Sequence, residues 1–171
     1  NESMNNYIVS ISRIDFDKNT DIILKYNNLM VDSNKRVKIF GAENRIYVHH
    51  KLKDLNFHEY WYGKYPKELP MNYKGKDILL GCKFMIDLSV IKNDGGGTQY
   101  TFLEAIYMNC ALILSNKWTD GVKTPFKHGV NCFIVKNEDE LAEILNKNPD
   151  TKHIVKNAKK MLKNHIKAYG W

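Results

Sequence analysis

Short apolar runs alternate with helical patterns along most of the chain. The apolar runs lack polar alternation, which is typical of strands buried on both faces. Helices are predicted where apolar residues recur every three or four positions, as in the stretch from Ile22 to Met30. The patterns predict strands at 6–11, 37–40, 57–62, 84–90, 111–115 and 131–135, and helices at 19–30, 99–108, 138–146 and 151–168, with a turn and a short helix between Pro66 and Cys82.

Buried strands separated by helices indicate a parallel sheet covered on both sides. The sequence therefore predicts an α/β fold: a Rossmann-like, doubly wound parallel sheet in a three-layer α/β/α sandwich. Such sheets bind ligands beyond the carboxyl ends of their strands. The candidate site residues are those that directly follow each strand.

The loop after the first strand carries two cations, Arg13 and Lys18. Arginine offers a planar fork of donors and lysine a compact charge, so the pair suits a diphosphate. Ordinary surface charge is the alternative interpretation of two basic residues in a loop.

The segment 93–100, Asn-Asp-Gly-Gly-Gly-Thr-Gln-Tyr, connects a predicted strand directly to a predicted helix. Consecutive glycines let the backbone approach a ligand closely, and free amides at a helix start favour phosphate. Glu104 follows among apolar neighbours, where a carboxylate needs a partner such as the hydroxyls of a ribose. A flexible turn and a solvent-facing glutamate are the alternatives. The dehydrogenase pattern G-x-G-x-x-G and the Walker A lysine-serine pair are both absent.

The amino-acid composition limits the expected number of domains and indicates the cellular setting. With 171 residues, 43% of them hydrophobic, we expect one domain. No apolar run approaches the roughly 20 residues of a membrane span, and the first residues lack a signal-peptide pattern, which predicts a soluble protein. Cys82, Cys110 and Cys132 are odd in number and lie in apolar segments, so reduced core thiols and a cytoplasmic location are expected.

The formal net charge of +7 raises the possibility of nucleic-acid binding. Most lysines are scattered, but the stretch from Lys152 to Lys167 concentrates them opposite an apolar stripe at helical spacing. A solvated helix face and a nucleic-acid surface are both compatible with this stretch. The excess of positive charge also suits a protein that handles diphosphates.

The order of motifs resembles the retaining glycosyltransferases of the GT-B fold, and within them the family 4 (group 1) type. Ser10–Ile14 with Lys18 is similar to that family's strand-Gly-Arg-Leu opening. The segments Val37–Gly41 and Tyr60–Gly63 resemble its next two strand-glycine signatures. The stretch from Asp87 through Glu104 to Ile106 resembles its phosphate-binding loop and helix, and His128–Val135 resembles its Asp-Gly-Val-Asn-Gly-Leu-Leu-Val ending.

The resemblance implies that the chain is the donor-binding half of such an enzyme, with residues 1–171 forming one nucleotide-sugar-binding domain. By that resemblance Arg13 and Lys18 grip the donor diphosphate together with the amides around Gly96, Gly97, Thr98 and Gln99, and Glu104 accepts the ribose hydroxyls. Main-chain atoms near Gly41 and Gly63 hold the base, with Asp94, Gly95 and Tyr100 beside the sugar or base. No metal or other cofactor is implied.

The chain departs from the family pattern at one position. The family's first glutamate lies eight residues before Glu104, where this chain has Gly96 and the nearest acid is Asp94. Thr98 and Gln99 are expected to supply replacement hydrogen bonds. By the resemblance, the acceptor site and the usual acid or base belong to an amino-terminal domain that is expected to lie outside these 171 residues, so no catalytic residue is assigned. His49, His50, His58 and His128 are candidates by residue type only.

Several alternatives stay open. By the resemblance UDP is the favoured donor nucleotide, with GDP and ADP next, and the acceptor is a polysaccharide, lipid, protein or DNA base. The stretches 60–63 and 99–104 also resemble phage glucosyltransferases that modify DNA bases. A basic nucleic-acid-binding module and a structural or regulatory Rossmann-like domain are the other classes of function.

Overall fold

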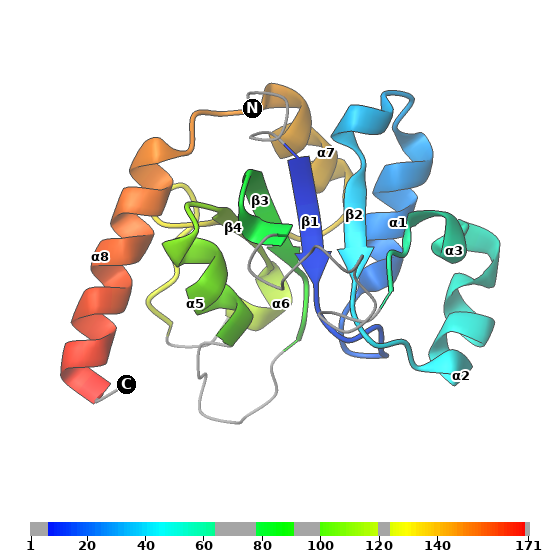
Figure 1. The fold of residues 1–171 in the computed structure, drawn as a ribbon, viewed down its shortest axis with the longest axis horizontal. Coiled ribbons are helices and arrows are strands. Elements are labelled where there is room, and N and C mark those ends of the chain that lie inside the picture. The colour runs from blue at the N-terminus through cyan, green and yellow to red at the C-terminus, as the bar shows by residue number, and fades with distance from the viewer. Residues whose placement is uncertain (1–6, 64–77, 91–99, 120–123, 170–171) are drawn as a thin grey trace.

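The computed structural model describes residues 7–63, 78–90, 100–119 and 124–169. Five parallel strands form one sheet in the order β2-β1-β3-β4-β5 (Figure 1). The first strand, β1, lies next to the edge strand β2, and the chain moves outward to β2 before it continues on the other side of β1. This arrangement confirms the doubly wound parallel sheet. The strands are β1 (Tyr7–Ile11), β2 (Val37–Phe40), β3 (Cys82–Asp87), β4 (Ala111–Ser115) and β5 (Phe133–Val135).

Helices flank the sheet within the described ranges. The long ones are α1 (Thr20–Leu29), α5 (Tyr100–Tyr107), α7 (Glu138–Lys147) and α8 (Lys152–Tyr169). The short ones are η2 (Ser33–Lys35), α2 (Arg45–Tyr47), η3 (Val48–Leu52), η4 (Lys53–Leu55), α3 (Phe57–Tyr60) and α6 (Asn116–Thr119). In this part of the chain no helix is both long and apolar enough to cross a membrane.

The sheet is buried on both faces, because alternate strand residues enter two separate apolar clusters. Ile8 and Ile39 face one cluster, which also contains residues of α1 and α7. Val9 and Met85 face the other, which contains residues of α5 and α8. A side-chain period of two directs successive residues to opposite faces. The absence of polar alternation in the sequence is thus explained by two covered faces.

The strand predicted at 57–62 is wrong. Residues 57–60 form the short helix α3, in which Phe57 and Tyr60 are buried one helical turn apart. Asn56 precedes the helix in the left-handed conformation, with φ 58°. Within this segment, Trp61 alone pairs with the sheet, through an isolated parallel bridge with Ile39 of β2. The aromatic residues therefore pack in the apolar cluster that Ile8 and Ile39 enter, instead of forming a further strand.

Two strand boundaries also differ from the prediction. Strand β3 begins at Cys82 and ends at Asp87, whereas the sequence predicts a strand over 84–90. The last strand begins at Phe133 rather than at residue 131, because Asn131 closes the preceding turn. Its side chain accepts from the Lys127 N–H (2.8 Å) and donates to the Pro125 carbonyl (2.9 Å).

All three cysteines are free and buried, as the sequence predicts. Burial raises the pKa of Cys132 to about 12, and the pKa of Cys82 is also raised, first by burial and then by its neighbour Cys110. The thiolate is the reactive form of cysteine. We therefore expect iodoacetamide at pH 8 to leave the folded chain unmodified over a period that fully labels the chain in denaturant. Mass spectrometry of both samples measures this, and rapid labelling of the folded chain would contradict it.

Candidate functional site

The strand order reverses at β1, so the loops that follow β1 and β3 flank the topological switch point where such sheets bind ligands. Two hydrogen bonds join these loops. Asn19 Nδ2 donates to the Leu88 carbonyl (2.8 Å), and the Val90 N–H donates to the Asp17 carbonyl (2.8 Å). The segment that carries Lys18 is therefore held against the end of β3.

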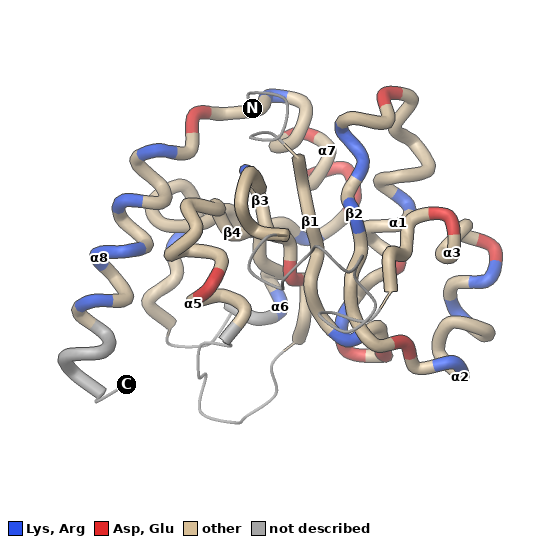
Figure 2. Tube along the Cα trace, viewed as in Figure 1, with Lys and Arg blue, Asp and Glu red and all other residues tan. Residues whose placement is uncertain are grey.

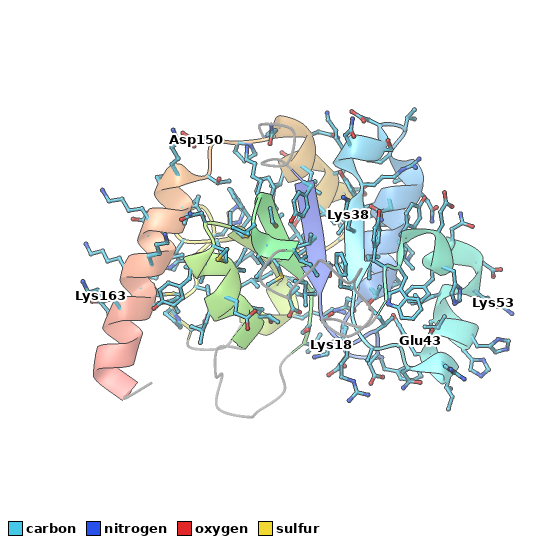
Figure 3. The ribbon with its side chains drawn as sticks, viewed as in Figure 1. Lys18, Lys38, Glu43, Lys53, Asp150 and Lys163 are labelled. Atoms are coloured by element: carbon cyan, nitrogen blue, oxygen red, sulfur yellow. The ribbon has the colours of Figure 1, made fainter. Side chains whose placement is uncertain are left out.

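The loop after β1 is also joined to the loop after β2. The Ile14 N–H donates to the Ala42 carbonyl (2.9 Å), and the Asn44 N–H donates to the Ile14 carbonyl (2.8 Å). Ile14 is fully buried between them. Asn44 then starts α2 by accepting from the Ile46 and Tyr47 amides. Lys18 and Glu43, from the two loops, both lie at the edge of the sheet where the strands end (Figure 3).

Gly41 lies where these backbones approach each other most closely. It has φ +146°, and a Cβ atom built on it would lie 1.6 Å from the Ser12 carbonyl oxygen. Its N–H donates to the Gly63 carbonyl (2.9 Å), and its own carbonyl accepts from Trp61 Nε1 (2.8 Å). The structure thus brings Gly41 and Gly63 together. The Gly41 N–H is therefore already bonded within the protein.

Arg13 and Lys18 each lie beside a different carboxylate. Arg13 Nη2 is 3.7 Å from Asp15 Oδ2, with 70% of the arginine side chain exposed. Lys18 Nζ is 4.0 Å from Asp17 Oδ2, and only 18% of its side chain is exposed. The pKa of Asp15 is lowered, mainly by the hydrogen bond from the Phe16 N–H and further by Asn44, Arg13 and Lys18, against a smaller opposing effect of burial. Arg13 is therefore the more accessible of the two cations, and Lys18 is the more buried.

Asp87, at the end of β3, is a site residue that sequence reasoning did not single out. The side chain is 2% exposed. Its Oδ1 accepts from the Ser89 N–H (2.9 Å) and from the Ser89 hydroxyl, whereas Oδ2 has no hydrogen-bond partner within the described residues. Burial raises the pKa of Asp87; Ser89 and the positive charge of Lys18 act in the opposite direction. The sequence did contain a signal for this residue, because Asp87 is an acidic residue at the end of an otherwise largely apolar strand.

The raised pKa of Asp87 predicts a pH-dependent stability. Folding favours the protonated form of Asp87. Its stabilising contribution to the free energy of unfolding is therefore complete below the pKa of the unfolded chain, near 3.8, and is lost as the pH rises through the pKa of Asp87 in the folded chain. We expect Asp87→Asn to be more stable than the native chain at pH 7, by about 1–3 kcal/mol, with the advantage shrinking toward pH 4. Urea unfolding between pH 4 and 7 measures this. The exposed Asp54→Asn is the control, and parallel curves for Asp87→Asn and the native chain would contradict the expectation.

The helix after β3, α5, carries Glu104 on an exposed position, next to the buried Ala105 and Ile106. The apolar setting expected for this carboxylate is therefore wrong, because Glu104 occupies the outer side of an amphipathic helix. Its ribose role stays a prediction that no longer depends on burial. The predicted residues Asp94, Gly95, Gly96, Gly97, Thr98 and Gln99 lie outside the described residues, and of Tyr100 only its place as the first residue of α5 is described.

The candidate histidines fall into two groups. His49 and His58 line a groove of about 540 Å³ beside Glu43, at the carboxyl edge of β2, and His50 adjoins His49. His128 Nδ1 accepts from the Ile134 N–H (2.8 Å), which fixes that ring in a turn. Across the described residues, no group of three or more histidine, cysteine or acidic side chains is placed to hold a metal ion.

A five-stranded doubly wound sheet with its loops at the switch point is the architecture of one half of a GT-B fold. Solved structures with this fold match the chain. Anabaena HepE in complex with UDP matches with a TM-score of 0.64 and 18% identity, over 93% of this chain and 44% of HepE. The chain thus spans less than half of that protein. No family model and no curated protein sequence matches the chain.

Two further matches agree in architecture. The pneumococcal O-GlcNAc transferase GtfA in complex with UDP and GlcNAc has a TM-score of 0.61 and 13% identity, over 94% of this chain and 32% of GtfA. The C-terminal domain of the group 1 glycosyl transferase LpcC from Francisella tularensis has a TM-score of 0.59 and 14% identity, over 92% of this chain and 85% of that domain. A separate C-terminal domain of comparable size therefore has the same fold.

Proposed function

We propose that the chain binds the nucleoside diphosphate of a sugar donor, as the donor half of a glycosyltransferase, with UDP as the favoured nucleotide. The observation that carries this proposal is the meeting of three loops at the switch point. The first brings Lys18 and the second Gly41, while the third leads from Asp87 toward α5. The matches to HepE and GtfA, both solved with UDP, support the nucleotide.

The proposed roles follow from the chemistry of each group. Arg13 and Lys18 contact the diphosphate as cations and offset the charge that develops on it when it leaves the sugar. Glu104 accepts hydrogen bonds from the ribose hydroxyls. Amides from residues 96–99 contact the phosphates, and main-chain atoms near Gly41 and Gly63 contact the base. Transfer to an acceptor is proposed to need the other half of the fold, so no catalytic acid or base is assigned to this chain.

Calorimetric titration with UDP, GDP and ADP tests the proposal. We expect one of the three diphosphates to bind the chain saturably. Glu104→Ala should lower the affinity for that diphosphate about tenfold or more, since hydrogen bonds to a charged group contribute roughly 1.5–3 kcal/mol. Glu143→Ala is the matched control, because this glutamate is exposed on α7 and pairs with Lys147 on the next turn. Equal affinity in both variants would exclude the ribose role, and no binding by any of the three would count against a donor site.

A further inference from the structure

The outer face of α8 presents a row of lysines. Lys152, Lys156, Lys160 and Lys163 are exposed and recur every three or four residues, and the helix contains no aspartate or glutamate. Figure 2 shows this row as basic positions along α8 without an intervening acidic one. At 1.5 Å per residue the row extends roughly 16 Å. A continuous line of positive charge of this length attracts a polyanion.

The opposite face of α8 packs into the protein core. Ile154, Val155, Ala158 and Leu162 are all buried. An amphipathic helix that binds a lipid surface inserts its apolar face between the headgroups. Because that face is already covered in α8, the lysine row favours an extended polyanion over a membrane.

A groove of about 560 Å³ opens at the amino end of this row. Lys83, Tyr107, Asn109 and Lys152 are among the residues that line it. Tyr107 is 57% exposed, which is high for so large an aromatic side chain. Lys152 belongs both to the lysine row and to the lining of the groove, so the two form one continuous surface. Beside it, Lys159 Nζ lies 2.6 Å from Asn109 Oδ1 of the groove lining.

The groove also contains one acidic residue, Asp150, which is already engaged. Its Oδ1 accepts from the Lys152 N–H (3.0 Å), so it caps the start of α8. Lys83 is held nearby by Asn148, with Nζ 2.7 Å from the asparagine Oδ1. Lys83 and Lys152 together exceed this single negative charge.

We propose that this surface, formed by the lysine row of α8 and the Tyr107 groove, binds single-stranded nucleic acid. Lysines that track a backbone and an exposed aromatic ring that stacks on a base are the two components of sequence-tolerant single-strand sites. A duplex offers no unstacked base to Tyr107. The groove adjoins Lys83 near the start of β3, whereas Arg13 and Lys18 follow the end of β1. Tyr107 lies one helical turn after Glu104 on α5, so the two proposed surfaces approach each other on this helix.

Fluorescence anisotropy with a labelled oligothymidylate of about 15 nucleotides tests this surface. We expect saturable binding that weakens with salt, with a log–log slope of about −2 to −3, as three or four phosphate contacts on a single strand predict. The variant with Lys152, Lys156, Lys160 and Lys163 all changed to glutamine should lose at least tenfold in affinity. The matched control changes Lys51, Lys53, Lys127 and Lys136 to glutamine and should lose less than threefold.

The aromatic contact has its own test. Tyr107→Ala should weaken oligonucleotide binding severalfold, while Tyr107→Phe, which keeps the ring, should not. Equal losses in the two lysine variants would overturn the proposal, as would an unchanged affinity in Tyr107→Ala. Binding to phosphatidylserine vesicles without binding to the oligonucleotide would assign the surface to a membrane instead and also overturn it. UDP titration of the α8 variant should be unchanged, which separates this result from the donor site.

Discussion

Gly41→Ala should destabilise the chain by about 4 kcal/mol, because it combines backbone strain with a backbone clash. The new Cβ would meet the Ser12 carbonyl oxygen at 1.6 Å, and φ +146° is a conformation that L side chains rarely adopt. Relief requires the β1 and β2 loops to separate, which breaks the bond from the Ser12 N–H to the Phe40 carbonyl. Urea unfolding of the variant measures the loss.

Gly129→Ala is the matched control for this experiment. Gly129 also has positive φ, +76°, but nothing lies within 4 Å of its added Cβ. Its cost is therefore only backbone strain, about 1–2 kcal/mol. Similar losses in the two variants would show that the close approach of Gly41 to Ser12 is not a structural requirement.

Lys18→Gln should weaken UDP binding by about tenfold or more, while leaving the weaker affinity for uridine unchanged. The lysine lies in the loop held against β3, and its side chain is 18% exposed, so a bound diphosphate would meet a partly desolvated charge. Calorimetric titration with both ligands separates a phosphate contact from a general disturbance of the site.

Lys25→Gln is the control for the charge itself. Lys25 lies on α1 and pairs with Asp21 on the preceding turn, with Nζ 3.7 Å from Oδ2. Its loss changes the net charge by the same amount, and we expect UDP affinity to stay within twofold, in line with the small effect of a screened surface charge. If Lys18→Gln and Lys25→Gln behave alike, Lys18 has no specific role in binding.

The sequence predicted the sheet because its inner strands are largely apolar on both sides. Ile8 and Val9 enter opposite clusters, and their shared hydrophobicity is the pattern of a doubly covered strand. The same kind of pattern produced the wrong prediction of a strand at 57–62. Its aromatic residues suit a strand, yet Phe57 and Tyr60 are buried on one side of a helical turn, and periodicity alone does not separate the two in so short a run.

The short helices between Asn44 and Leu55 were not predicted. A cap signal was present, since Asn44 accepts from two amides of the following turn, and Val48 and Leu52 are buried four residues apart. The position of the candidate site was predictable, because ligand-binding loops follow the ends of the strands. The contacts and burial of its side chains were not. The burial of Asp87 beside Lys18 depends on how the chain returns from β2 to β3, which no local pattern encodes.

The proposed nucleoside diphosphate site lies at the switch point of the sheet. Titration of the ¹⁵N-labelled chain with UDP, followed by two-dimensional NMR, tests the location directly. We expect the largest amide shifts on Arg13, Lys18, Gly41 and Gly63, with little change around Lys83 and Lys152. Shifts centred on Lys83 and Lys152, or no shifts at millimolar UDP, would contradict a donor site at the switch point.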